Sequence, residues 1–565
     1  MRLMNLLKTG LAACFLGLVL SSSLLAADCT SIAAVSLSGY DRLDGSIAKV
    51  LDTAGCEEFY NALNMMLGGI DGIDKSQPAG FVLLTDGNDL IPFAFLPVAD
   101  FDELTCPGIE VLKEELNYDK ESKTIGLSGN SDDQSDTDTG NFRLIEADGW
   151  LFVTPIKFES SVPTQIDPIT WLEGLDSKYL IGGILHVDRM PSEVLDTLIS
   201  PLRVAASKEE NLARSLESLG KWTDFVKTNV QTYEFGFSVD SSNGDVILSS
   251  STTPIPDSSL ARALKLNEKP VTIWSDFYSP EKSIFSLSDS EVYEPTMVDF
   301  LKEYWSSAFS SWEAALSREE EDEETVAKAK DLLKGLEEWV GKNYDLGRTD
   351  SALSFGADGT LSAACTIADG SGFQKLLVRS FQFVTTILEE NEPDDVDVQK
   401  FLKSFKVNDT PYKGYTVTTF SIPCPMDKTY SFLVGVKDDA VILLAGPSKK
   451  VVSDLFKEKS AADRSEAPAE MKWVFSAPNL AKFIQTFEES VSDHETVGSV
   501  TAQIASGSAD AVIIGQKNLT SLSSEISITI KGELIKLLYG TFSTVFQSDD
   551  DTVEEEFETD ENDLF

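Results

Sequence analysis

Short segments in which every second residue is apolar recur along the whole chain, and this period-two pattern constrains the fold more than any other feature. Two of them, Phe81 to Leu84 and Ile91 to Leu96, flank the turn Asp86-Gly87 and predict a β-hairpin. The segment Tyr430 to Leu444, with Asp438-Asp439 at its centre, predicts another. Strands joined by tight turns run antiparallel, so the pattern favours antiparallel sheets over alternating strand-helix-strand units.

Amphipathic helical patterns separate the predicted strands. Residues 295–317 and 323–340 predict two long helices joined by an acidic run. A further helix is indicated by apolar residues at spacings of three and four, namely Leu212, Leu216, Leu219, Trp222, Phe225 and Val226. The predicted fold class is therefore α+β, with several domains in which antiparallel sheets are covered by amphipathic helices.

One arrangement of strand, tight turn, strand and helix is predicted three times. The three turns are Asn243-Gly244, Asp358-Gly359 and Lys517-Asn518. The unequal separations exclude a solenoid, which needs a fixed period. Duplicated modules and a generic recurrence of hairpin plus helix both remain open.

The first 27 residues are typical of a secretory signal peptide, with basic Arg2 and Lys8, an apolar stretch from Leu11 to Leu20, and small residues before Asp28. The apolar stretch is shorter than the roughly 20 residues that a membrane-spanning helix needs. We therefore expect an exported protein, periplasmic or extracellular, with no membrane span in the mature chain. A lipoprotein signal ending at Cys14 is the alternative.

The length of the chain predicts more than one domain, because single hydrophobic cores stop growing at roughly 250 to 300 residues. We predict an N-terminal α+β domain over 28–232 and a C-terminal α+β region over 233–545, which forms one or two subdomains and contains the helical part 295–345. Residues 546–565 are so acidic and so poor in apolar side chains that they predict a disordered tail.

The charge balance of the chain limits the classes of molecule that it is expected to bind. Asp and Glu number 93 against 46 Lys and Arg, which gives a formal net charge of −47. Such a field repels phosphate backbones and anionic lipid surfaces, so nucleic acid is excluded as an expected partner and other envelope components remain possible ones. The simplest interpretation is that these charges are solvated and keep the exported protein soluble.

Five cysteines follow the predicted signal: Cys29, Cys56, Cys106, Cys365 and Cys424. Exported proteins commonly form disulfides, so these cysteines are first considered as disulfide partners. We predict that Cys365 pairs with Cys424, which would close a loop of about 60 residues and stabilise the fold by roughly 4 kcal/mol. Cys29 with Cys56 is a second candidate pair. The alternative is that all five cysteines are unpaired and act as small buried hydrophobic residues.

One segment carries the carboxylate pattern of a possible calcium site, at Asp132, Asp133, Asp136 and Asp138. Alternating carboxylates in a loop offer the oxygen ligands that calcium takes, but the closing glutamate of an EF-hand loop is missing, since that position is Ala147. A solvated linker is the favoured interpretation, and weak calcium binding is the alternative.

Catalytic motifs are scarce in the sequence. No GxSxG nucleophile elbow and no HExxH helix is present. His186 lies in a strand-like segment where Asp188 could face the same side, as in a base oriented by a carboxylate. No nucleophile motif accompanies it, so a hydrogen-bonded histidine within a sheet is the favoured interpretation.

Several short motifs occur in an order that resembles large secreted proteins of planctomycete bacteria. They are Gly72 to Lys75, Pro78 to Gly80, Leu84 to Gly87, Phe95 to Asp100, Asp148 to Pro155, Phe235 to Asp240 and Gly435 to Gly446. The resemblance covers most of the mature chain and implies export. It implies no activity and no catalytic residue.

The sequence leaves three functions open. A non-enzymatic envelope or extracellular protein is expected first, because no motif assembles a nucleophile, a base and oxyanion donors. An exported hydrolase that uses scattered carboxylates is the second possibility. A calcium-responsive or apolar-ligand carrier is the third.

Overall fold

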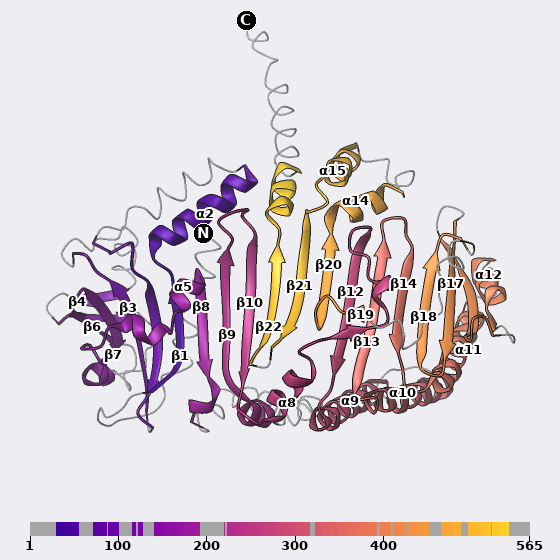
Figure 1. Cartoon of the computed structure of the whole chain (residues 1–565), viewed down its shortest axis with the longest axis horizontal. Coiled ribbons are helices and arrows are strands. Elements are labelled where there is room, and N and C mark those ends of the chain that lie inside the picture. The colour runs from indigo at the N-terminus through magenta and orange to yellow at the C-terminus, as the bar shows by residue number, and fades with distance from the viewer. Residues whose placement is uncertain are drawn as a thin grey trace, which may run out of the picture. The chain divides into compact units, whose positions relative to one another are not determined.

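A computed structural model gives the fold of this protein (Figure 1). It describes residues 30–55, 72–87, 89–100, 116–119, 122–127, 141–191, 220, 223–316, 323–391, 396–407, 411–424, 428–448, 450, 465–486, 495–520 and 522–541. The chain divides into two compact units. The N-terminal unit comprises Met1–Ala205 and Thr223–Ile255, and the C-terminal unit comprises Ala206–Trp222 and Pro256–Phe565.

The N-terminal unit contains an antiparallel sheet. In their order across the sheet, its strands are β4 (Leu116–Asp119), β5 (Thr124–Leu127), β6 (Asn141–Ala147), β7 (Trp150–Pro155), β3 (Leu90–Pro97), β2 (Ala79–Thr85), β1 (Thr30–Leu37), β8 (Ile181–His186), β9 (Val230–Val239) and β10 (Val246–Pro254).

The core of the N-terminal unit lies against one face of this sheet. Phe93 and Phe95 of β3 and Phe152 of β7 are almost completely buried there. They pack with residues of the segment that links β7 to β8, which forms η1 (Ile156–Ser161), η2 (Pro168–Leu172) and α5 (Leu175–Lys178). The unit also contains α2 (Tyr40–Ala54), η3 (Val187–Arg189) and helical residues 223–229.

The C-terminal unit also contains an antiparallel sheet. Across it lie β15 (Lys406–Val407), β16 (Thr416–Cys424), β17 (Lys428–Lys437), β18 (Ala440–Gly446), β14 (Leu361–Thr366), β13 (Arg348–Gly356), β12 (Ser283–Val292), β20 (Met471–Ser476), β21 (Val512–Leu519) and β22 (Ser524–Ile530). A separate two-stranded sheet pairs β11 (Val271–Thr272) with β19 (Ser465–Glu466).

The two units have the same topology. In each, a first strand (β1 or β12) pairs with a hairpin (β2–β3 or β13–β14), and a four-stranded meander then returns to the outer strand of that hairpin. A later strand (β8 or β20) pairs with the other side of the first strand and with a second hairpin (β9–β10 or β21–β22). This shared strand order is expected of two duplicated units. It matches the hairpin β9–β10 to β21–β22 but the hairpin β13–β14 to β2–β3, so the three predicted arrangements are not three copies of one module.

Helices of the C-terminal unit connect its strands. They are α8 (Ser259–Leu266), η4 (Ser275–Phe277), α9 (Pro295–Leu316), α10 (Glu323–Tyr344), α11 (Gly370–Asn391), α12 (Val396–Ser404), α14 (Ala477–Gln485), α15 (Glu495–Ala505) and helical residues 532–541. The hairpin of α9 and α10 links the end of β12 to the start of β13, so it lies at that end of these strands (Figure 1).

The sheet of the C-terminal unit has a core on each face. Val434 and Val436 of β17 pack on one face with Trp339 of α10 and with residues of α11. Leu433 of β17 points to the other face, where Trp274 is completely buried. This alternation follows from the period of two along a strand, which sends neighbouring side chains to opposite faces.

The structure confirms the predicted α+β class with antiparallel sheets, and it confirms both hairpins and the two helices after residue 295. The predicted turn at Lys517-Asn518 lies inside β21. The expected domain boundary after residue 232 falls inside β9, whereas the chain finally leaves the N-terminal unit after Ile255. The predicted signal peptide, the acidic tail, Cys29, Cys56, Cys106 and most of the helix over 212–226 lie outside the described residues.

The structure contradicts the predicted disulfide between Cys365 and Cys424, because Cys365 is a free thiol. Strand register explains why the pair cannot form. Cys365 is aligned through β18 and β17 with Thr416 at the start of β16, whereas Cys424 ends that strand. Strand rise and spacing put the two residues roughly 30 Å apart, well beyond the Cα separation of about 7 Å that a disulfide tolerates.

We expect Cys365 to react slowly with alkylating reagents in the native protein. Burial raises the pKa of its thiol to about 11, which leaves little thiolate at pH 8. Native alkylation should be on the order of 100-fold slower than alkylation of the unfolded chain. Peptide mapping without reduction measures this rate, and a peptide cross-linked between Cys365 and Cys424 would contradict both the register and this prediction.

Candidate functional site

The candidate site lies where the helix hairpin α9–α10 meets the sheet of the C-terminal unit. Aromatic side chains of α9 repeat at spacings of four and three residues, at Trp305, Phe309 and Trp312, and therefore share one face of the helix. Their rings touch edge to face or tilted, with centroids 6.1 Å apart for Trp305–Phe309 and 5.1 Å for Phe309–Trp312. The indole N–H of Trp305 donates to the hydroxyl of Tyr344, the last residue of α10, over 2.6 Å.

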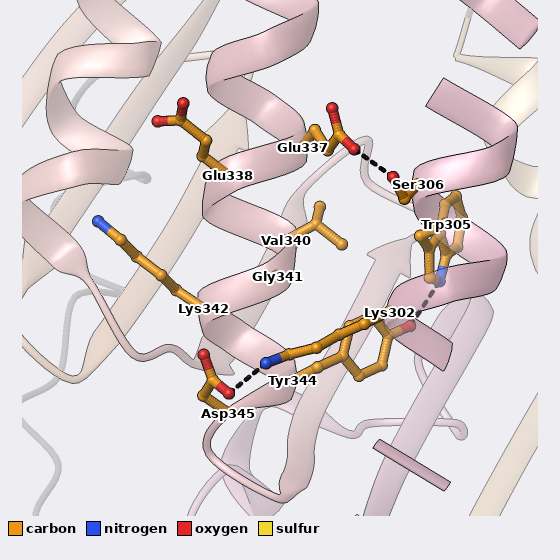
Figure 2. Close-up of a pocket in the computed structure, with 10 residues that line it drawn as sticks. All are labelled: Lys302, Trp305, Ser306, Glu337, Glu338, Val340, Gly341, Lys342, Tyr344 and Asp345. Carbon is orange, nitrogen blue, oxygen red and sulfur yellow. Dashed lines mark hydrogen bonds and ion pairs between the residues drawn. The ribbon is translucent and has the colours of Figure 1, made fainter. Parts of the chain in front are cut away.

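The first of two adjoining cavities, the hairpin pocket, has a volume of about 550 Å³ (Figure 2). It is lined by Lys302, Trp305, Ser306, Glu337, Glu338, Val340, Gly341, Lys342, Tyr344 and Asp345.

Polar contacts engage much of the lining of the hairpin pocket. Figure 2 shows Lys302 reaching Asp345 and Ser306 facing Glu337, to which its hydroxyl donates over 2.7 Å. Lys342 points away from α9 in this view and donates to Asp369 over 2.6 Å. Both lysines therefore already have a carboxylate partner, so this pocket offers a ligand little unpaired charge.

The second cavity, the sheet pocket, has a volume of about 310 Å³ and shares Trp305, Val340 and Tyr344 with the first. It extends to the sheet, since β13 and β14 supply part of its wall. Its lining comprises Tyr293, Trp305, Trp339, Val340, Asn343, Tyr344, Arg348, Thr349, Asp350, Ser351, Cys365, Thr366 and Ile367.

Four of these lining residues are aromatic, and their polar atoms are only partly engaged. The rings of Tyr293 and Tyr344 lie 5.8 Å apart between centroids. Burial raises the pKa of both tyrosine hydroxyls, so both stay protonated at neutral pH. The indole N–H of Trp339 is shielded from solvent and meets no acceptor among the described residues. A buried donor without an acceptor is unusual in a native structure and leaves a position that a ligand atom could satisfy.

The polar wall of the sheet pocket is held by bonds to the backbone. Asn343 donates to the carbonyl of Trp339 over 2.7 Å and accepts from the amide of Ala368 over 2.9 Å. Asp350 accepts from the hydroxyl of Thr272 over 2.6 Å and from the amide of Ile273 over 3.1 Å. The bonds of Asn343 fix its side chain before any ligand arrives, which is the preorganisation that binding sites need. The carboxylate of Asp350 is held on the opposite face of the sheet, beside Thr272, so it is not offered to a ligand in this pocket.

A partly buried charge cluster, which we define as Asp289, Glu291, Glu470 and Lys517, lies close to the sheet pocket. Glu470 is 1% exposed, whereas Glu291 and Lys517 are 24% and 22% exposed. The ammonium of Lys517 is 3.0 Å from Glu470 and 3.4 Å from Glu291. The cluster connects to the pocket through Thr349, which hydrogen-bonds Asp289 and accepts from the hydroxyl of Tyr293 over 3.4 Å.

Two carboxyl groups of the charge cluster have raised pKa values. Burial raises the pKa of Glu470 to about 8, and the neighbouring Glu291 raises it further against the opposing effect of Lys517. Burial also raises the pKa of Asp289 to about 6, again with a contribution from Glu291. Desolvation disfavours the charged form of a carboxyl group, and a second carboxylate nearby adds to this effect.

Sequence reasoning missed the charge cluster because strand pairing alone assembles it. Asp289 is aligned with Met471, and Met471 with Lys517, so β12, β20 and β21 bring together residues far apart in the chain. Glu291 and Lys517 are 226 positions apart. The local signal was the pair Asp289 and Glu291, two residues apart and hence on one face of a predicted strand.

The residues that the sequence singled out as candidate metal ligands or as a candidate base line neither pocket. Asp132, Asp133, Asp136 and Asp138 lie outside the described residues, and the residues that are described contain no group of three or more possible metal ligands. His186 ends β8 in the N-terminal unit.

His186 is 2% exposed, and its Nε2 atom lies 2.9 Å from a carboxylate oxygen of Glu173. Glu173, rather than Asp188, is therefore its close carboxylate neighbour. Burial lowers the pKa of this histidine. These features fit the favoured interpretation of a buried sheet histidine.

Comparison with known proteins assigns the chain to no family: no protein-family model, no curated protein and no solved structure matches it. Within the described ranges, no helix has both the length and the apolar character needed to cross a membrane.

Proposed function

We propose that this is an exported, non-enzymatic envelope or extracellular protein whose C-terminal unit binds a small molecule in the sheet pocket. The observation that carries the proposal is this cavity of about 310 Å³, which is within the size range of small-molecule sites. Aromatic walls and a few fixed polar groups are typical of such sites. Export rests on the signal-like first 27 residues, and the resemblance to secreted planctomycete proteins agrees with it.

The chemistry of the pocket favours binding over catalysis. Its thiol, Cys365, has a pKa raised by burial to about 11, so it is a poor nucleophile at neutral pH. Asp350 is already bonded to Thr272 and to the backbone. The pocket thus combines shape and hydrogen-bonding groups without an activated nucleophile beside a base.

A hydrolase is the second candidate, because Asp289 and Glu470 have the raised pKa values expected of general acids. Neither residue lines the sheet pocket or the hairpin pocket. Glu470 is 1% exposed and therefore cannot reach a substrate without rearrangement. Burial and the neighbouring Glu291 account for both raised pKa values without any catalytic role, and we rank hydrolysis below binding for this reason.

A screen of small polar and aromatic metabolites against the purified mature chain tests the proposal. We expect at least one compound to raise the melting temperature by several degrees, as binding to the native state does. Replacement of Trp305 by leucine removes a wall shared by both pockets and should weaken that compound at least about 10-fold. Tryptophan fluorescence measures the affinity directly, because Trp305 and Trp339 line the cavity.

Trp312→Leu is the matched control, because Trp312 lies on the same helix, is 47% exposed and lines neither pocket. It should leave affinity unchanged. Tyr293→Leu, which alters the sheet pocket alone, should weaken binding even if Trp305→Leu fails to fold. A screen without a stabilising compound would refute the proposal, and so would unchanged affinity in the pocket variants. Turnover that Asp289→Asn abolishes would favour the hydrolase instead.

A further inference from the structure

We propose that the N-terminal unit binds a neutral, β-linked polysaccharide on an exposed apolar face of its sheet. The site, which we name the sheet platform, lies on the neighbouring strands β1, β8, β9 and β10 (Figure 1). It comprises six exposed apolar side chains, namely Val35, Leu37, Ile181, Tyr233, Phe235 and Leu248. The sheet platform belongs to a different unit from the sheet pocket, so this proposal does not rest on the function proposed above.

Strand register places the six side chains on one face, because residues aligned across antiparallel strands share a face of the sheet. One row runs from Val35 through Gly183 to Phe235. The next row on this face comprises Leu37, Ile181, Phe237 and Leu248. Tyr233 lies two residues before Phe235 and therefore shares its face. Ala34 and Ile184 alternate to the opposite face, where they belong to the core of the unit.

The ring of Phe235 leans over the neighbouring strand β8. Gly183 has no side chain there, and a Cβ atom at this position would lie 2.4 to 3.2 Å from three atoms of the ring. The ring thus packs directly on the backbone, yet the side chain is still 45% exposed. Tyr233 is 39% exposed, and its ring lies 6.3 Å from that of Phe235 between centroids, at an angle of 33°. The two rings form an aromatic surface that is open to solvent.

The size of the sheet platform argues against a second copy of the chain as its occupant. Its six side chains are 39% to 46% exposed. At roughly 200 Å² for a large side chain, they leave on the order of 500 Å² of apolar surface. A stable dimer buries about 800 Å² on each partner, whereas functional patches on monomers measure about 300 to 600 Å². The formal net charge of −47 also opposes contact between two copies.

The same charge limits the chemistry of a smaller ligand. A strongly negative chain repels acidic polysaccharides and anionic lipid surfaces, and none of the six side chains carries a charge. An uncharged ligand with an apolar face of its own therefore fits best. Pyranose rings with equatorial hydroxyls, as in β-1,4-linked glucans, have such a face, because their C–H groups point up and down from the ring and pack against aromatic side chains.

The border of the sheet platform suits the hydroxyl groups at the edges of such sugars. Ser250 and Thr252 of β10 are aligned with Phe235 and Tyr233, so a hydroxyl flanks each ring on the same face of the sheet. Hydroxyls both donate and accept hydrogen bonds, as the hydroxyls of a sugar do. An extended glucan chain could thus lie over both rings and bond to β10.

Titration calorimetry with cellohexaose and maltohexaose tests the proposal on the full mature chain. Both are neutral chains of six glucose units, but the β-linkages of cellohexaose give a flat ribbon and the α-linkages of maltohexaose give a curved chain. We expect cellohexaose to bind with a dissociation constant below about 1 mM and maltohexaose to bind at least about 10-fold more weakly.

Phe235→Leu keeps an apolar side chain and removes the ring, so it should weaken cellohexaose about 10-fold. Tyr233→Leu should weaken it as well and serves as the test if Phe235→Leu fails to fold. Tyr412→Leu is the matched control, because Tyr412 is 48% exposed and lies in the C-terminal unit. It should leave the affinity unchanged.

No binding of cellohexaose would overturn the proposal, and so would equal binding of the two glucans. Sedimentation of the glycan-free protein should show a monomer. A dimer that Phe235→Leu dissociates would instead assign the sheet platform to a second copy and overturn the glycan. The proposed function is judged separately, because the variants of the sheet pocket lie in the other unit.

Discussion

Replacing Lys517 by methionine should lower the free energy of unfolding by about 3 to 5 kcal/mol at pH 8. The substitution removes the cation that lies 3.0 Å from Glu470 and 3.4 Å from Glu291 while leaving both carboxyl groups in place, so Glu470 must take up a proton or remain as an unpaired carboxylate. A buried carboxylate without a partner is strongly unfavourable, because the protein interior solvates charge poorly. Urea-induced unfolding at fixed temperature measures the loss.

Two further variants make this result specific. Lys437→Met removes a cation from an exposed pair with Asp439, whose side chains are 37% and 73% exposed, and should change stability by less than about 0.5 kcal/mol. The double variant Lys517→Met with Glu470→Gln should recover part of the loss, since one of the unpaired carboxylates is gone. Unchanged stability of Lys517→Met at pH 8 would refute the ion-pair interpretation of the cluster.

Glu470→Gln should stabilise the protein above pH 8 and change little at pH 5. The pKa of Glu470 is raised from its ordinary value of 4.5 to about 8 by burial and by Glu291. The native state therefore binds more protons than the unfolded state between these two values, so the contribution of this group is fully present below pH 4.5 and is lost as pH rises towards 8. Glutamine is neutral at every pH and removes that loss, which we expect to be several kcal/mol and at most about 5 kcal/mol.

Melting temperatures of wild type and variant between pH 5 and pH 9 test this prediction. The difference should be near zero at pH 5 and should grow in favour of glutamine as pH rises. Glu324→Gln is the control, because this carboxylate is 74% exposed and its removal should give a small difference that is flat with pH. A Glu470→Gln variant that is less stable than wild type at pH 9 would show that the carboxylate, rather than the acid, is the favoured form.

The ion pair also links the two predictions. At pH 5 Glu470 is protonated, so Lys517→Met leaves fewer charges unpaired than at pH 8. The loss caused by that substitution should accordingly be smaller at pH 5. A loss of the same size at both values would place the stabilising effect in packing of the lysine side chain instead.

The sequence by itself determined the local elements of this protein. The hairpins β2–β3 and β17–β18 and the helices α9 and α10 follow from patterns within about 20 residues, because apolar spacing and turn residues act between near neighbours. The α+β class with antiparallel sheets follows from the same patterns. These features need no knowledge of which strands become partners.

Tertiary structure decided everything that depends on partners distant in sequence. Strand pairing placed β20 between β12 and β21, and only then did Lys517 meet Glu291 and Glu470. The register of β14, β18, β17 and β16 also separated Cys365 from Cys424, which both lie in strands as their sequences suggested. A period-two pattern fixes which side chains share a face, but it carries no information about which strand lies alongside, so the sheet pocket and the charge cluster could come only from the fold.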